Sequence, residues 1–128
     1  VIARQKELIE DLARRHPNAV VMVESALIFE AAYSVASEWQ QRFDRIILVT
    51  APEDVKIARF VQRCAGDGEM TEERRLEVEA EARLRLARLV PDDQKIALCD
   101  YVLTNDGPVT ELEWQVDQLW PILRLAAR

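Results

Sequence analysis

The sequence has few of the residues that build metal centres and disulfide frameworks. It contains one histidine, His16, and two cysteines, Cys64 and Cys99, which lie 35 residues apart. This spacing fits neither a zinc site, whose ligands come in close pairs, nor the dense cysteine pattern of a small secreted domain. Both cysteines are therefore expected to be reduced thiols in the core or at its edge.

Long apolar runs are also missing. No segment approaches the roughly 20 apolar residues that span a bilayer, and the first residues do not resemble a signal peptide. The formal net charge is −6, so the chain lacks the excess of Lys and Arg with which proteins neutralise nucleic-acid phosphates. These shortages predict a cytoplasmic protein that binds neither a membrane nor a nucleic acid.

What is present is an ordinary globular composition, with 49% hydrophobic and 31% charged residues. A chain of 128 residues suits one domain. At that size folding buries about two thirds of the surface of the unfolded chain. The sequence therefore predicts a single domain over residues 1–128.

The apolar residues are most concentrated in residues 19–30, AVVMVESALIFE. Five of the first six residues of this stretch are apolar without alternation, which predicts a strand of a parallel sheet over residues 19–24. Glu24 stands at the end of that strand, where ligands bind in open α/β sheets. The alternative is a carboxylate that only caps a loop or pairs with a surface cation.

The remaining pattern alternates helices with strands. Helices are predicted over residues 1–15, 31–42, 53–64, 71–89, 92–98 and 109–126, and further strands over residues 45–50 and 100–105. Pro121 is expected to kink or split the last helix. Strands separated by helices predict the α/β class, here a three-layer parallel sheet with helices on both faces. The charged helix within residues 66–90 is expected to form a lid-like flap.

Several segments, in the same order, resemble dephospho-CoA kinases. They are the run from Glu24 to Glu30, the turn VTAPE at residues 49–53, the pair Arg59 and Arg63, Pro91 with Lys95, and DYVLTNDG at residues 100–107. The resemblance covers nearly the whole chain and the C-terminal two thirds of that family. It implies a P-loop kinase-like fold and transfer of the ATP γ-phosphate to the 3′-hydroxyl of dephospho-CoA, with Mg²⁺, in coenzyme A biosynthesis.

The resemblance also implies roles for particular residues. Arg59 and Arg63 match lid arginines that reach ATP phosphates and serve catalysis, and Glu24 matches an acid near the magnesium ion and phosphates. Asn105 and Gly107 match a turn against the adenine, whereas Leu27, Phe29 and Glu30 match a run beside the dephospho-CoA substrate. An arginine on a mobile lid would supply positive charge to phosphoryl transfer after closure.

The sequence departs from the family at several positions. Ala26 replaces a proline, Cys64 and the insertion at residues 65–68 follow Arg63, and Leu89 stands in place of a glutamine. The chain also contains no G-x-x-x-x-G-K-[ST] loop, because its glycines are only Gly66, Gly68 and Gly107. The sequence is therefore expected to be incomplete at its N-terminus. The intact protein would be an ATP-dependent phosphotransferase, and this chain alone would be inactive.

Two other functions stay open: a non-catalytic α/β binding or oligomerisation module, and a part of another nucleotide kinase. In P-loop kinases the strand before the phosphate loop would lie between the strands at residues 19–24 and 45–50. Three occupants of that place are open: a segment outside these 128 residues, a strand exchanged within a homodimer, or direct pairing of the two flanking strands.

Overall fold

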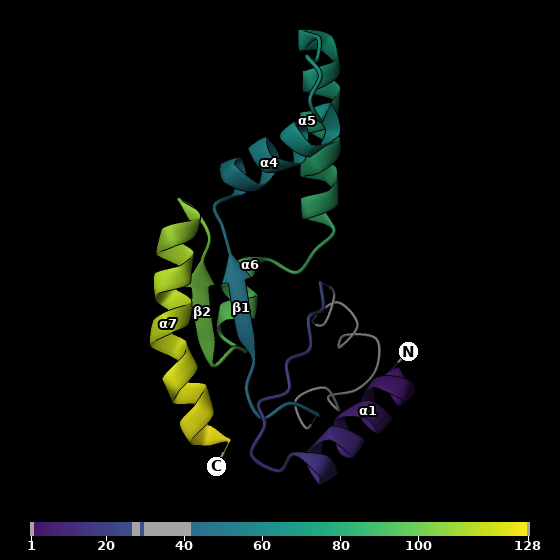
Figure 1. Cartoon of the computed structure of the whole chain (residues 1–128). Helices are drawn as coiled ribbons and strands as arrows, with labels where there is room; N and C mark the ends of the chain where they lie inside the picture. Colours follow the sequence, from purple (N-terminus) through teal and green to yellow (C-terminus); the bar gives the residue numbers. More distant parts are fainter. Residues whose placement is uncertain (1, 27–28, 30–41, 128) are drawn as a thin grey trace. The chain divides into compact units, whose positions relative to one another are not determined.

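The computed structural model describes residues 2–26, 29 and 42–127 of the chain (Figure 1). These residues fall into two compact units. One unit is Arg45–Pro108, and the other combines Val1–Asp44 with Val109–Arg128. Each unit has its own secondary structure.

The unit Arg45–Pro108 is built on two parallel strands, β1 (Ile47–Thr50) and β2 (Tyr101–Thr104). Ile47 pairs with Tyr101 and Thr50 with Thr104, so the two strands end at the same level of the sheet. Both strands were predicted, and their parallel pairing confirms the α/β class. In the described part of the chain the sheet has these two strands only.

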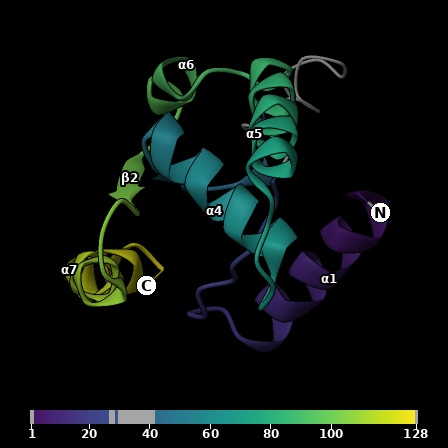
Figure 2. The same ribbon diagram turned by 90° about the horizontal axis from the view of Figure 1, so that it is seen from above.

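The connection from β1 to β2 begins with two helices, α4 (Glu53–Ala65) and α5 (Glu72–Ala87), which lie side by side in Figures 1 and 2. Pro52 and two acids start α4, as the sequence predicts, and Gly66 ends it with a φ of +59° that only glycine adopts without strain. The Thr71 hydroxyl caps α5 by accepting a hydrogen bond from the backbone N–H of Arg74 at 3.2 Å.

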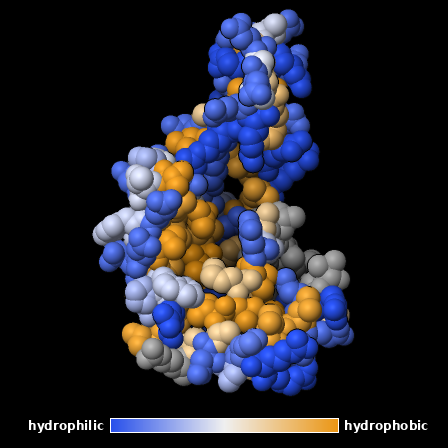
Figure 3. All heavy atoms as spheres, in the orientation of Figure 1, coloured by the Kyte–Doolittle hydropathy of each residue, from blue (hydrophilic) through white to orange (hydrophobic). Residues whose placement is uncertain are grey.

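Apolar side chains hold these two helices together. Val78 and Ala82 of α5 are buried one turn apart, and Ile57 of α4 is buried as well. The guanidinium of Arg85 on α5 lies 5.2 Å from the ring centre of Phe60 on α4, within cation–π range. We call residues 51–91 the α4–α5 arm. Its visible surface is mostly hydrophilic in Figure 3.

A short helix, α6 (Asp92–Ile96), follows the arm and precedes β2. The Asp100 carboxylate then accepts a hydrogen bond from the backbone N–H of Ile46 at 2.7 Å, just before the two strands begin to pair. Cys99, between α6 and β2, is half-buried, and this burial, reinforced by the charge of Asp100, raises the pKa of its thiol. Cys64, in the last turn of α4, is exposed, contrary to expectation.

The second unit contains α1 (Ile2–Arg15) and α7 (Val109–Ala126). Near α1, the Arg42 guanidinium donates a 2.6 Å hydrogen bond to the side-chain oxygen of Gln5. Helix α7 runs through Pro121 as one element, so of the two predicted effects the split is wrong and the kink stays a prediction. Trp114 and Trp120 on α7 are exposed. Within the described residues, no helix is both long and apolar enough to cross a membrane.

The strand predicted over residues 19–24 is wrong. These residues form no helix or strand, and Met22 is 66% exposed. An apolar run becomes a strand only when a neighbouring backbone accepts and donates its hydrogen bonds, and no described strand pairs with it. Direct pairing of residues 19–24 with residues 45–50 is therefore wrong as well. The helix predicted over residues 31–42 lies outside the described residues, apart from Arg42.

Candidate functional site

Polar side chains meet where the two strands end. Because β1 and β2 are parallel and in register, Thr50 and Asn105 come to the same edge of the sheet. The backbone N–H of Asn105 donates a 2.7 Å hydrogen bond to the carbonyl oxygen of Thr50, extending the ladder by one residue. This edge is the one at which open α/β sheets bind their ligands.

Helix α4 places Arg59 over the end of β2. One Nη atom of Arg59 donates a 2.7 Å hydrogen bond to the backbone carbonyl of Asn105, and the other lies 3.5 Å from its side-chain oxygen. Arg59 is half-buried in this position. The guanidinium therefore fastens α4 to the turn that begins at Asn105 and continues through Gly107.

A second set of contacts joins β1, α4 and α6. The hydroxyl of Thr50 donates a short hydrogen bond to Asp92 Oδ2, and Lys56 Nζ donates to the same oxygen at 2.7 Å. Burial alone would raise the pKa of Asp92, but the hydrogen bonds from Lys56 and Thr50 and the charges of Lys56 and Lys95 lower it overall. Asp92 is therefore an ionised carboxylate at neutral pH.

Arg63 lies one turn beyond Arg59 on α4, in the last turn of the helix. Its side chain is exposed, and within the described residues it makes no hydrogen bond or ion pair. Residues four apart in a helix share a face, so Arg63 continues the line on which Arg59 stands. Of the two arginines, Arg63 is the one whose charge is available to a ligand.

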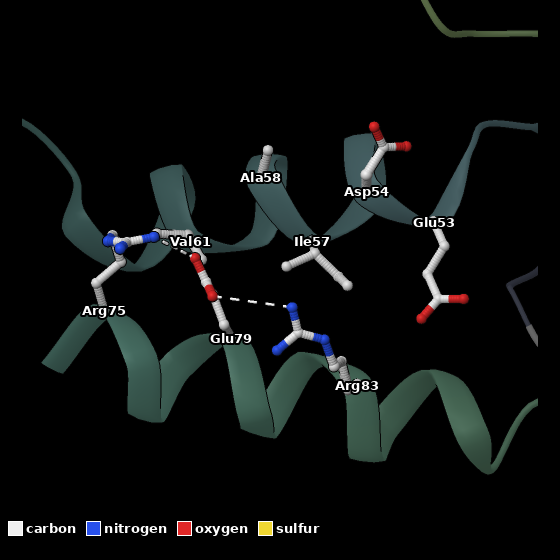
Figure 4. Close-up of a pocket in the computed structure, with 8 residues that line it drawn as sticks. All are labelled: Glu53, Asp54, Ile57, Ala58, Val61, Arg75, Glu79 and Arg83. Atoms are coloured by element: carbon white, nitrogen blue, oxygen red, sulfur yellow. Dashed lines mark hydrogen bonds and ion pairs between the residues drawn. The ribbon is translucent and has the colours of Figure 1, made fainter. Parts of the chain in front are cut away.

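A groove of about 660 Å³ runs between α4 and α5 (Figure 4). In Figure 4, Ile57 points toward α5, whereas Asp54 and Ala58 point away from it. Glu79 of α5 lies between Arg75 and Arg83, and its carboxylate is 3.9 Å from Arg83. The hydrogen bond with Glu72, together with the charges of Glu72 and Glu79, raises the pKa of Arg75. The Arg75 guanidinium is thus paired with two carboxylates of α5, Glu72 and Glu79, whereas Arg83 makes the longer, 3.9 Å contact with Glu79.

No family model matches the chain, and no solved structure does. Its curated relatives include three dephospho-CoA kinases. The protein from Corynebacterium efficiens is 30% identical over 112 residues, which cover 88% of this chain and 50% of the relative. Those from Chlorobaculum tepidum and Anaeromyxobacter dehalogenans are 31% and 29% identical over 109 and 123 residues, covering 85% and 96% of this chain and 44% and 49% of the relatives.

The chain resembles dephospho-CoA kinases over nearly all of its length. The resemblance inferred from the sequence motifs is thereby confirmed. The chain spans about half the length of these curated kinases. Activity, substrate and partners of the whole protein therefore remain matters of proposal.

Two of the residues that match dephospho-CoA kinase motifs come together in the structure, because Arg59 contacts Asn105. Gly107 follows two residues after Asn105 and is exposed. Glu24 is exposed and Phe29 is buried, both in the other unit. Leu27 and Glu30 lie outside the described residues. The roles of all these residues in binding ATP, Mg²⁺ or dephospho-CoA stay predictions.

Sequence reasoning missed Thr50, Lys56 and Asp92 as a group. Asp92 follows Pro91 at the start of a helix, where an acid usually serves the helix end alone. The available signal was the position of Thr50 at the end of a predicted strand. Its partner Asp92 lies 42 residues further along the chain, which no local pattern indicates.

Proposed function

We propose that this chain is part of a dephospho-CoA kinase, which transfers the γ-phosphate of ATP to the 3′-hydroxyl of dephospho-CoA. The observation that carries the proposal is similarity to several dephospho-CoA kinases along 83–96% of the chain. The contact of Arg59 with Asn105, where β1 and β2 end, supports it, because phosphoryl transfer depends on positioned cations near the strand ends.

In this proposal Arg59 and Arg63 act differently. Arg59 holds α4 against the turn at Asn105 and Gly107, which would lie beside the adenine of ATP. Arg63, exposed one turn further on, would meet the negative charge that develops on the transferred phosphoryl group. Closure of the arm over the nucleotide would bring Arg63 to that charge.

The remaining assignments rest on sequence matching. Glu24 would hold Mg²⁺ near the phosphates, and Leu27, Phe29 and Glu30 would line the dephospho-CoA site. One carboxylate with substrate phosphates and water is an ordinary magnesium environment, and Glu24 is exposed and so accessible to solvent. When bound, the metal would neutralise charge on the β- and γ-phosphates. Among the described residues no three potential metal ligands cluster.

The proposal includes a fold larger than the two-stranded sheet. A three-layer P-loop kinase fold would place a further strand beside β1, supplied by a segment outside these 128 residues or by a second copy of the chain. In either case the phosphate loop would come from a segment outside these 128 residues, because its glycine and lysine pattern does not occur in them.

The test is a phosphate-acceptor assay on the natural protein in its full length. With ATP and Mg²⁺, we expect phosphorylation of dephospho-CoA and little turnover of adenylate or other nucleoside monophosphates. Preferred turnover of a monophosphate would indicate a different nucleotide kinase. Absence of transfer to every acceptor, from a folded protein, would favour a non-catalytic α/β module.

A further inference from the structure

The α4–α5 arm leaves the sheet and returns to it at one place. The chain enters the arm after Thr50, at the end of β1, and returns at Asp92, the first residue of α6. The hydrogen bond from Thr50 to Asp92 therefore connects the two ends of the arm directly. Lys56, in the first turns of α4, adds a second bond to the same carboxylate oxygen.

The two ends of the arm are held differently. Helix α4 has an additional attachment, because Arg59 donates to the backbone carbonyl of Asn105. At the returning end, Arg88 and Leu89 donate backbone hydrogen bonds to carbonyls of α5, and the Pro91 carbonyl accepts from backbone N–H groups of α6. The Asp92 carboxylate joins this end of the arm to both β1 and α4.

A simpler role for Asp92 would be that of an acid in the first turn of a helix. Its neighbour Asp93 is the matched case, since it also lies in the first turn of α6. Asp93 is exposed, and among the described residues its carboxylate accepts only from the adjacent backbone N–H of Gln94. The side chain of Asp92 is 28% exposed and reaches two other elements. A helix-terminal role therefore does not account for the contacts of Asp92.

We propose that Asp92 is a positioning residue. It fixes the base of the α4–α5 arm, meaning the place where the chain leaves β1 after Thr50 and returns at Asp92, and so sets where Arg63 is presented. Lys56 and Thr50 are its partners. The inference rests on the proposed function for the role of Arg63, whereas the fixed base of the arm stands independently of it. Loss of the carboxylate charge removes the ion pair with Lys56 and weakens the hydrogen bond from Thr50, which loosens the returning end of the arm.

The first test measures the arm itself, in the full-length protein. Spin labels go on Cys64, which is exposed at the end of α4, and on an introduced Ala97→Cys, exposed after α6, with Cys99 and any cysteine outside these 128 residues replaced by serine. We expect Asp92→Asn to broaden the distribution of distances between the labels, and the matched Asp93→Asn to leave it unchanged. An unchanged distribution in folded Asp92→Asn would overturn the proposal.

The second test separates positioning from overall stability. A misplaced cationic group costs turnover more than substrate binding, so we expect Asp92→Asn to lower kcat by about tenfold to a hundredfold with little change in the KM for dephospho-CoA. Lys56→Gln removes the same ion pair from the other side and should give the same result, even if Asp92→Asn fails to fold. Equal effects of Asp92→Asn and Asp93→Asn on kcat would contradict the role.

The two proposals fail in different ways. If the labels show a loosened arm but the wild-type protein phosphorylates no acceptor, the fixed base stands and the kinase assignment fails. If the wild-type protein is a dephospho-CoA kinase and the labels do not respond to Asp92→Asn, the kinase assignment stands and the positioning role fails.

Discussion

Arg59 and Arg63 are the same residue type, four positions apart on one helix, yet their surroundings give them different capacities. Arg59 is half-buried and donates to a backbone carbonyl, so moving it to a ligand would break that bond. Arg63 is exposed, and long exposed side chains reorient at little cost. The resemblance to dephospho-CoA kinases implies the same role for both arginines. In the structure Arg59 attaches α4 to Asn105, whereas the charge of Arg63 is exposed to solvent.

Replacement of Arg63 by alanine tests that available charge. In the full-length protein we expect Arg63→Ala to lower kcat by on the order of a hundredfold, with a smaller change in the KM for dephospho-CoA, because the guanidinium acts on the transition state. Steady-state kinetics with both substrates varied measures the two effects. Arg74→Ala is the control, since Arg74 is exposed on α5 and its guanidinium pairs with Glu77 of the same helix. An unchanged kcat in Arg63→Ala would make Arg63 an ordinary solvated cation.

Asp92 also predicts how stability depends on pH. Its pKa is lower in the folded chain than its usual value near 4, so its contribution is complete above that value and is lost as the pH falls through the folded pKa. Replacing it by asparagine should lower the free energy of unfolding at pH 7 by about 1 kcal/mol, the size of a typical hydrogen bond. Denaturant titrations of wild type and Asp92→Asn should differ at pH 7 and converge at the acidic end. A constant difference at all pH values would contradict this linkage.

Sequence patterns predict the site residues that depend on local structure, but not the contacts between residues far apart in the chain. Asn105 could be predicted because it follows an apolar run, DYVLT, that does form a strand. Lys56 and Asp92 could not be paired, because they lie 36 residues apart and each has a sufficient local explanation on its own helix. Only the parallel pairing of β1 and β2 brings their elements to one place.

The start of α5 depends on a capping residue, Thr71, that can be recognised from the sequence. Thr71→Ala removes the hydroxyl that accepts from the backbone N–H of Arg74, and the cost should be about 1 kcal/mol. Because α5 is otherwise rich in exposed charge, hydrogen exchange of the amides in its first turn should rise most. Thr71→Ser keeps the hydroxyl and should restore protection. Equal exchange in the alanine and serine variants would show that the cap contributes nothing.

Strand prediction succeeded twice and failed once on the same kind of pattern. RIILVT and DYVLTN each contain a strand, whereas AVVMVE contains none. The first two pair with each other, and the third has no described partner. Apolar patterning shows that a segment can be buried, and the hydrogen-bonding partner decides whether it becomes a strand. Pro121 is a second case in which a local pattern does not decide the element, because α7 continues through it.

For the molecule as a whole, the proposed kinase needs a phosphate loop that these 128 residues do not encode. We therefore expect the 128-residue chain alone to transfer no phosphate and to bind ATP more weakly than micromolar, because the loop whose backbone amides and lysine would hold the phosphates does not occur in its sequence. Isothermal titration of ATP into the chain measures this. A micromolar dissociation constant would contradict the expectation and point to a different nucleotide site.

The parallel pairing of β1 and β2 also sets the order of events during synthesis. The two strands are separated by a connection of about 50 residues, so at 5–20 residues per second β2 is made roughly 3 to 10 seconds after β1. Helices α4 and α5 are neighbours in sequence and can pack within that interval, because helix formation and short-loop closure take microseconds or less. The arm is then a folded hairpin before its base exists. Residues 47–50 are thus made seconds before the partner with which they form a strand, and a chaperone can bind them in that interval; Val49 is 55% exposed even after pairing.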